Sequence, residues 1–235
     1  MSESFRGARA SVGPIATGYD GPTRLLDLRF GDRAVRLVQP ADPDRLLDDA
    51  AVVALNHRED YMPYWAYVWP GASLLAEAVA RESWVEGTRA LEIGCGLGLA
   101  GLVAVASGLV VDFTDYDEAP LRFVERSLME NGFSPQQGTT RRLDWREPGG
   151  ERYPIILGAD VLYESRLVPL VCDLISALLL PGGVALIAGP YRVATEELES
   201  CLNSRGLAAS AVPIACAAEG LPPSQGTLHR ITRRI

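Results

Sequence analysis

The stretch Leu91-Glu92-Ile93-Gly94-Cys95-Gly96-Leu97-Gly98 joins an apolar strand to a glycine-rich loop, and it decides the fold. A strand is predicted over residues 89–93 and a helix of small residues over 99–107. A strand, a tight glycine loop and a helix in succession open a β-α unit of a parallel sheet. Glycine adopts positive φ and has no Cβ, so the backbone here can turn sharply and approach a ligand.

Strands and helices alternate on the C-terminal side of this loop. Further strands are predicted over residues 109–114, 139–143, 154–159 and 184–188, and helices over 118–131, 167–180 and 195–204. Two last strands, 207–214 and 227–231, have no helix between them, which indicates an antiparallel edge. The predicted fold class is therefore α/β, a Rossmann-like, doubly wound sheet of seven strands, mostly parallel with an antiparallel C-terminal edge.

The chain before this core has a different pattern. Residues 1–22 are rich in Gly, Ser, Ala and Pro, which predicts a flexible tail. Apolar alternation on both sides of Gly31-Asp32-Arg33 predicts a small β-hairpin, and Asp42-Pro43 opens a helix predicted to run to about Asn56. That helix would carry an apolar stripe of Leu46, Leu47, Ala50, Val53 and Ala54. We expect a tail (1–22), an N-terminal extension (23–60) and one domain (61–235).

Composition argues against several classes of partner. The 235 residues carry a formal net charge of −8, which disfavours a nucleic-acid backbone as the main partner. No apolar run is long enough to cross a bilayer, and Met1-Ser2-Glu3-Ser4 does not begin a secretory signal, so we expect a cytoplasmic protein without a membrane partner. All basic residues are arginine, which we attribute to codon usage in a GC-rich bacterium.

Cysteine and histidine are too scattered to form a metal site or a disulfide framework. The four cysteines contain no C-x-x-C pair, and His57 and His229 are the only histidines. We therefore expect free thiols, no metal and no hydrolase triad.

The glycine loop is a candidate ligand site because it follows a strand of a parallel sheet. A dinucleotide fingerprint needs glycine at position 99, whereas here Gly94, Gly96 and Gly98 enclose Cys95 and the next residue is Leu99. Glu92 precedes the loop, and a carboxylate there would attract an ammonium group and repel a pyrophosphate. The alternative is a tight turn without a ligand.

Acidic residues also follow the next three strands, at the same predicted edge of the sheet. Asp115, followed by Tyr116, could accept both hydroxyls of a ribose, with Asp117 as a competitor for that role; helix N-capping is the alternative for either. Asp144 could accept an adenine amino group while the Trp145 indole packs on the ring or simply in the core. Asp160 follows an apolar strand and would face the same crevice, or cap a helix.

Together these residues resemble family 16 of the class I, seven-strand methyltransferases. Asp160-Val161-Leu162-Tyr163 matches the Asp-x-x-Tyr/Phe motif of that group, and Pro63-Tyr64-Trp65-Ala66-Tyr67-Val68-Trp69-Pro70-Gly71 resembles its segment before the core. With Gly189-Pro190-Tyr191-Arg192, this segment is most similar to the electron transfer flavoprotein β-subunit lysine methyltransferase branch.

The resemblance implies S-adenosyl-L-methionine as cofactor and a protein lysine as the methyl acceptor. It places Trp69 near the cofactor and assigns Asp160 and Tyr163 to catalysis, with Asp160 holding either acceptor or cofactor. Aromatic residues that could line an acceptor channel are Tyr64, Trp65, Tyr67, Trp69 and Tyr163. A small-molecule N-methyltransferase and a non-catalytic cofactor-binding protein are the alternatives. The sequence leaves the oligomeric state open.

Overall fold

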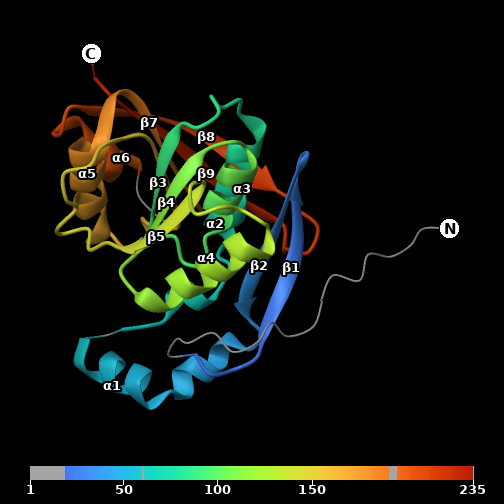
Figure 1. Ribbon diagram of the computed structural model, residues 1–235. Helices are drawn as coiled ribbons and strands as arrows, with labels where there is room; N and C mark the ends of the chain where they lie inside the picture. The colour runs from blue at the N-terminus through green and yellow to red at the C-terminus, as the bar shows by residue number, and fades with distance from the viewer. Residues whose placement is uncertain (1–18, 60, 191–194, 235) are drawn as a thin grey trace.

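The computed structural model describes residues 19–59, 61–190 and 195–234 and contains a seven-stranded sheet (Figure 1). Its order is β5-β4-β3-β6-β7-β9-β8. The strands are β3 (Arg89–Ile93), β4 (Val110–Asp115), β5 (Gly138–Arg142), β6 (Tyr153–Ala159), β7 (Leu179–Gly189), β8 (Leu207–Cys216) and β9 (Ser224–Arg233). The first five pair in parallel, whereas β9 is antiparallel to both β7 and β8. The predicted fold class is confirmed.

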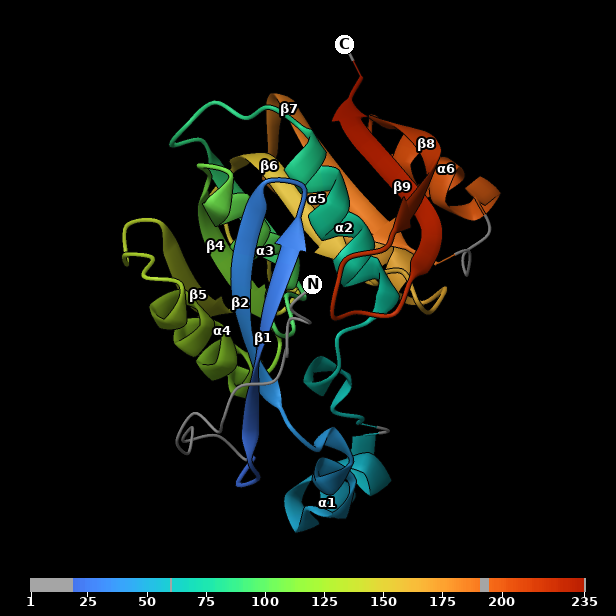
Figure 2. The same cartoon turned by 90° about the vertical axis from the view of Figure 1, so that its right-hand side faces the viewer.

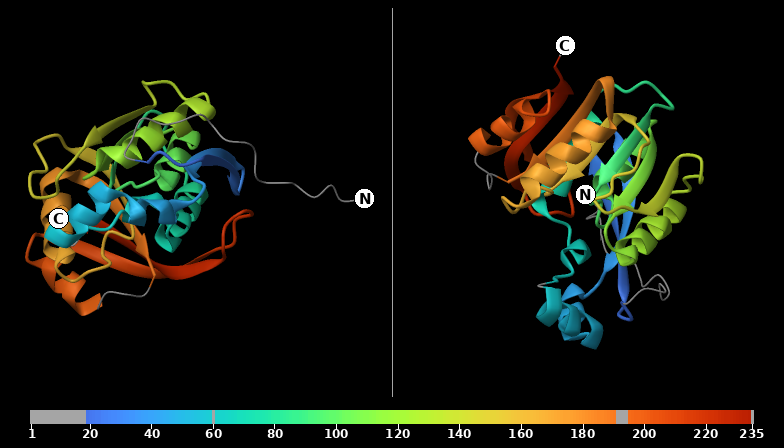
Figure 3. Two further views of the ribbon diagram at one scale, coloured as in Figure 1. Left: turned by 90° about the horizontal axis from the view of Figure 1, so that it is seen from below. Right: turned by 90° about the vertical axis from the view of Figure 1, so that its left-hand side faces the viewer.

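Helices cover both faces of the sheet (Figures 1 and 3). On one face lie α2 (Pro70–Arg81), α3 (Leu99–Ala106) and α4 (Glu118–Glu130), and on the other lie α5 (Leu167–Leu178) and α6 (Thr195–Asn203). Each face has its own apolar core. Strand order reverses between β3 and β6, which is where a doubly wound sheet opens a crevice beyond its carboxyl ends.

The predicted hairpin forms a separate two-stranded sheet of β1 (Thr23–Phe30) and β2 (Arg33–Pro40), which covers α3 and α4 (Figure 2). Phe30 and Leu37 are fully buried beneath it. The Ser127 hydroxyl of α4 accepts a 2.9 Å hydrogen bond from the Val38 N–H. Residues 1–18 of the predicted tail lie outside the described residues; Tyr19, which follows them, is buried with its ring centroid 6.0 Å from that of Phe123.

The single helix predicted from Asp42 to about Asn56 is wrong. The chain forms a 3-10 helix, η1 (Pro43–Asp48), and then α1 (Ala50–Glu59), which stands away from the body (Figure 2). They separate at Asp49, whose extended backbone lets its carboxylate accept hydrogen bonds from the N–H groups of residues 51 and 52. Of the predicted apolar stripe only Leu46 is buried, because the two helices do not share one face toward the core. Helix α2, which is not among the predicted helices, begins with a proline at its first position.

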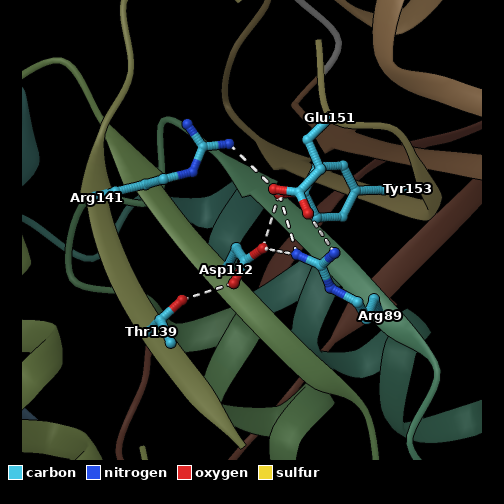
Figure 4. A network of polar contacts seen from close by, with 6 residues as sticks. All are labelled: Arg89, Asp112, Thr139, Arg141, Glu151 and Tyr153. Carbon is cyan, nitrogen blue, oxygen red and sulfur yellow. Dashed lines mark hydrogen bonds and ion pairs between the residues drawn. The ribbon is translucent and has the colours of Figure 1, made fainter. Parts of the chain in front are cut away.

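The crossover from β5 to β6 contains no helix, although parallel strands are usually joined through one. Where this crossover enters β6, a network of polar side chains lies against the sheet (Figure 4). Asp112 accepts hydrogen bonds from Tyr153 (2.7 Å) and Thr139 (2.6 Å) and forms an ion pair with Arg89 (2.5 Å). Arg89 also pairs with Glu151. The network fixes the amino ends of β3 and β6 together.

No helix among the described residues is long and apolar enough to cross a membrane.

Candidate active site

The glycine loop connects β3 to α3 with an unusual backbone. Gly94 and Gly98 have φ of 55° and 76°, a region that side chains with a Cβ avoid. Gly98 is the N-cap of α3. A Cβ on Gly94 would lie 2.9 Å from a ring carbon of Trp145, so this glycine lets the indole lie directly against the loop. The structure thereby brings together two predicted site residues from different crossovers.

Glu92 lies beneath the loop, with 2% of its surface exposed. Its Oε2 atom is buried and has no hydrogen-bond partner among the described residues. Burial raises the pKa of this carboxyl to about 8. Cys95 follows in the loop, and burial raises the pKa of its thiol well above the usual value, so it is a neutral group. The loop therefore covers an acid that no cation among the described residues balances.

Asp115 ends β4 and binds the glycine loop. Its Oδ2 accepts a 2.9 Å hydrogen bond from the Gly96 N–H, and its Oδ1 accepts one of 3.1 Å from the Asp117 N–H. Burial raises its pKa to about 6. Each carboxylate oxygen has two acceptor positions, and these two hydrogen bonds occupy one on each oxygen.

Asp144 and Tyr116 lie among arginine side chains. Arg146 binds Asp144 with Nη2 at 2.5 Å and Nε at 2.9 Å. The guanidinium carbons of Arg142 and Arg146 lie 5.1 and 5.9 Å from the centre of the Tyr116 ring, which is 46% exposed. The hydrogen bond to Arg146 lowers the pKa of Asp144 and keeps it ionised.

Asp160 follows β6 in a strained conformation. Its φ is 53°, and it is the only non-glycine residue with positive φ in the described part of the chain. The Gly71 N–H, in the first turn of α2, donates a 2.5 Å hydrogen bond to its Oδ2, and its own N–H bonds the Ala188 carbonyl at 2.9 Å. Gly71 has room only for hydrogen, because a Cβ would overlap this carboxylate. A helix N-terminus thus holds the negative charge at the crevice.

Four of the predicted channel aromatics form one continuous cluster beside Asp160. The ring centroid of Tyr64 lies 5.9 Å from that of Trp69 and 5.7 Å from that of Tyr163. The ring centroids of Tyr67 and Trp69 lie 5.8 Å apart. Tyr64 and Tyr163 are 44% and 42% exposed. We call Tyr64, Tyr67, Trp69 and Tyr163 the aromatic wall.

Trp65 is separate from the aromatic wall. It is buried, and its ring lies 5.5 Å from that of Phe123 in α4. Two further participants, Tyr61 and Gly71, are not marked by the sequence as site residues, because neither belongs to a strand-end pattern. Tyr191 and Arg192 of the predicted Gly-Pro-Tyr-Arg segment lie outside the described residues.

The buried acids test whether the site fits the expected cofactor. Glu92 and Asp115 lie at the glycine loop and Asp160 follows the neighbouring strand β6, and no salt bridge within the described residues neutralises Glu92 or Asp115. A cationic ligand with hydroxyl groups suits such a site. With the strand order and the glycine loop, this arrangement gives the chain the fold and the site layout of the class I S-adenosylmethionine-dependent methyltransferases.

Comparison with known proteins identifies the family. A family model described as lysine methyltransferase matches residues 56–199, and the chain belongs to that family. The electron transfer flavoprotein beta subunit lysine methyltransferase of Xenopus laevis is 29% identical over 129 residues, covering 54% of this chain and 52% of that protein. The protein N-lysine methyltransferase METTL21A of Danio rerio is 30% identical over 156 residues, covering 60% and 71%. The chain spans about half the length of the first of these relatives.

Solved structures share the fold at low sequence identity. The magnesium protoporphyrin IX methyltransferase of Synechocystis, with SAH bound, has a TM-score of 0.57 at 14% identity and covers 68% of this chain and 82% of its own. The ribosomal protein L11 methylase of Lactobacillus delbrueckii has a TM-score of 0.54 at 16% identity, with coverages of 68% and 77%. The cofactor of the matched methyltransferase family is S-adenosylmethionine, which supplies a methyl group on a positively charged sulfur.

Proposed function

We propose that the chain methylates the side-chain amine of lysine in a protein substrate. The observation that carries this proposal is the aromatic wall beside Asp160, a partly exposed aromatic surface next to a carboxylate held by a helix N-terminus. The relatives named as lysine methyltransferases support the same acceptor.

The proposed cofactor contacts follow from the acceptor positions left at the strand ends. Asp115 would accept the ribose hydroxyls through its carboxylate oxygens. Glu92, below the loop, would balance the ammonium group, and Gly94 and Gly96 would let the backbone approach the ligand. Trp145 would pack against the adenine ring, with Asp144 at its edge.

The aromatic wall would prepare the acceptor. A lysine amine must lose its proton before its lone pair can form the new N–C bond, and apolar surroundings lower the pKa of an amine by disfavouring its charged form. The Asp160 carboxylate would orient the amine. Because the methyl donor is already activated by charge, the protein contributes mainly orientation and exclusion of water.

Labelled methyl transfer into a host-cell lysate tests the acceptor. The purified chain is incubated with radiolabelled S-adenosylmethionine, the products are separated by size, and modified residues are identified by mass spectrometry. The chain itself contains no lysine, so every methylated lysine must come from a substrate. We expect label in protein, at lysine, with the wild-type chain.

Two variants test the proposed catalytic residues by removing the charge of one and the hydroxyl group of the other. Asp160→Asn keeps a side chain that tolerates positive φ, and Tyr163→Phe keeps the ring of the aromatic wall. We expect at least one of them to lower the transfer rate about 100-fold. If both retained the wild-type rate, the catalytic assignment would be wrong. Label confined to small molecules would instead identify a small-amine methyltransferase.

A further inference from the structure

Tyr61 connects the segment before the core to the proposed ribose site. Its hydroxyl donates a 2.6 Å hydrogen bond to Oδ2 of Asp117, at the start of α4. Its backbone is fixed from the other side, because the Asn56 side chain donates to the Tyr61 carbonyl at 3.0 Å. Two segments that are distant in sequence are therefore joined at a partly buried point.

The local sequence explains why Asp117 is available to Tyr61. Asp117 is the N-cap of α4, and an N-cap aspartate usually accepts a hydrogen bond from the N–H of the second or third helical residue. The third helical residue is Pro120, which has no N–H. The Asp117 side chain makes no capping bond and reaches Tyr61 instead.

Asp117 in turn orients Asp115. Its backbone N–H bonds Oδ1 of Asp115, while the Gly96 N–H bonds Oδ2. The glycine loop also lies against the segment that contains Tyr61, because a Cβ on Gly96 would lie 3.5 Å from the Trp65 carbonyl oxygen. Residues 61–65, the start of α4 and the glycine loop thus form one closed set of contacts around the Asp115 carboxylate.

We propose that Tyr61 is a positioning residue for the cofactor, which acts through Asp117 to hold Asp115 in the orientation that accepts the ribose hydroxyls. This inference rests on the ribose role proposed for Asp115. Tyr61 stays a neutral donor, since burial and the neighbouring Asp117 carboxylate both raise the pKa of its phenol. Without the hydroxyl, Asp117 and the loop that follows Asp115 lose their fixed position.

Tyr61→Phe tests the inference by calorimetry with SAH and by steady-state kinetics. Loss of a hydrogen bond to a carboxylate should weaken SAH binding about 10-fold and raise the KM for S-adenosylmethionine similarly. The kcat should stay within about 2-fold, because the acceptor contacts are untouched. Asp117→Asn retains an oxygen that accepts the phenol proton, so it should bind SAH nearly as the wild type does.

Tyr153→Phe is the matched control, since it removes a tyrosine-to-aspartate hydrogen bond of 2.7 Å at the opposite end of the strands. It should lower the Tm and leave the KM for S-adenosylmethionine unchanged. A Tyr61→Phe variant with lower Tm but wild-type SAH affinity would overturn the inference and leave Tyr61 a structural residue. Wild-type affinity in Asp115→Asn would instead refute the ribose assignment itself.

Discussion

Carboxylates at the two ends of the parallel strands differ in their binding partners and in the direction of their pKa shifts, and β4 contains an example of each. Asp112 is bound by Arg89, Tyr153 and Thr139, and these hydrogen bonds outweigh burial and lower its pKa (Figure 4). Asp115, at the carboxyl end, is bound by backbone N–H groups and by no arginine of the described residues, and burial raises its pKa to about 6.

This difference separates a structural site from a binding site. At the amino ends every carboxylate of the network has a cationic partner from the chain, so little is left for a ligand to neutralise. At the carboxyl ends the burial cost of Glu92 and Asp115 is not offset by arginine in the described structure. A cation that enters the crevice would recover that cost as binding free energy.

The largest expected effect comes from neutralising one aspartate at each end. Asp115→Asn removes the proposed ribose acceptor and should weaken SAH binding about 100-fold, measured by calorimetry. Asp112→Asn should leave SAH affinity unchanged and lower the free energy of unfolding by about 2 kcal/mol in urea titration, because Arg89 loses its charged partner. Equal losses of SAH affinity in both variants would remove the distinction between the two ends.

A rise in pH should change the contributions of the two ends to the free energy of unfolding in opposite directions. Asp115 has a folded pKa of about 6, above its ordinary 3.8, and Glu92 one of about 8, above 4.5. Between the ordinary and the folded pKa of each group the folded chain binds more protons than the unfolded chain, so the stability of the free protein falls as the pH rises from about 4 to about 8. The lowered pKa of Asp112 works the other way: its contribution is present above 3.8 and is lost as the pH falls further.

The same titrations should govern cofactor affinity. A cationic ligand binds the ionised site, so the protonation of Asp115 alone should lower the affinity for S-adenosylmethionine about 10-fold between pH 7.5 and pH 5, and the protonation of Glu92 should lower it further. Calorimetry across this range measures the effect, and Asp115→Asn should flatten the part that arises from Asp115. A wild-type affinity independent of pH would show that Asp115 does not titrate in the free protein.

The sequence predicts the carboxyl ends of the strands better than the amino ends. Glycine spacing and acids after apolar strands are local patterns, so Gly94, Asp115 and Asp160 could be singled out from the sequence. The contacts of Tyr61 with Asp117 and of Gly71 with Asp160 join segments 56 and 89 residues apart, and no period or motif encodes them. The polar network around Asp112 was missed for the same reason. The break at Asp49 was missed because the hydrogen bonds of its side chain to the following N–H groups compete with a continuous helix, and the apolar pattern of the sequence does not show that competition.

The smallest effect is expected at the outer edge of the amino-end network. Glu151 is largely exposed and pairs with an Arg89 guanidinium that Asp112 also binds. Glu151→Gln should therefore change the free energy of unfolding by less than about 1 kcal/mol, since exposed ion pairs are screened and Arg89 keeps its inner partner. Urea titration and SAH calorimetry on the same sample measure stability and affinity together. A clear loss of affinity would mean that the network reaches the cofactor site through β3 and β4, and that the two ends are coupled rather than independent.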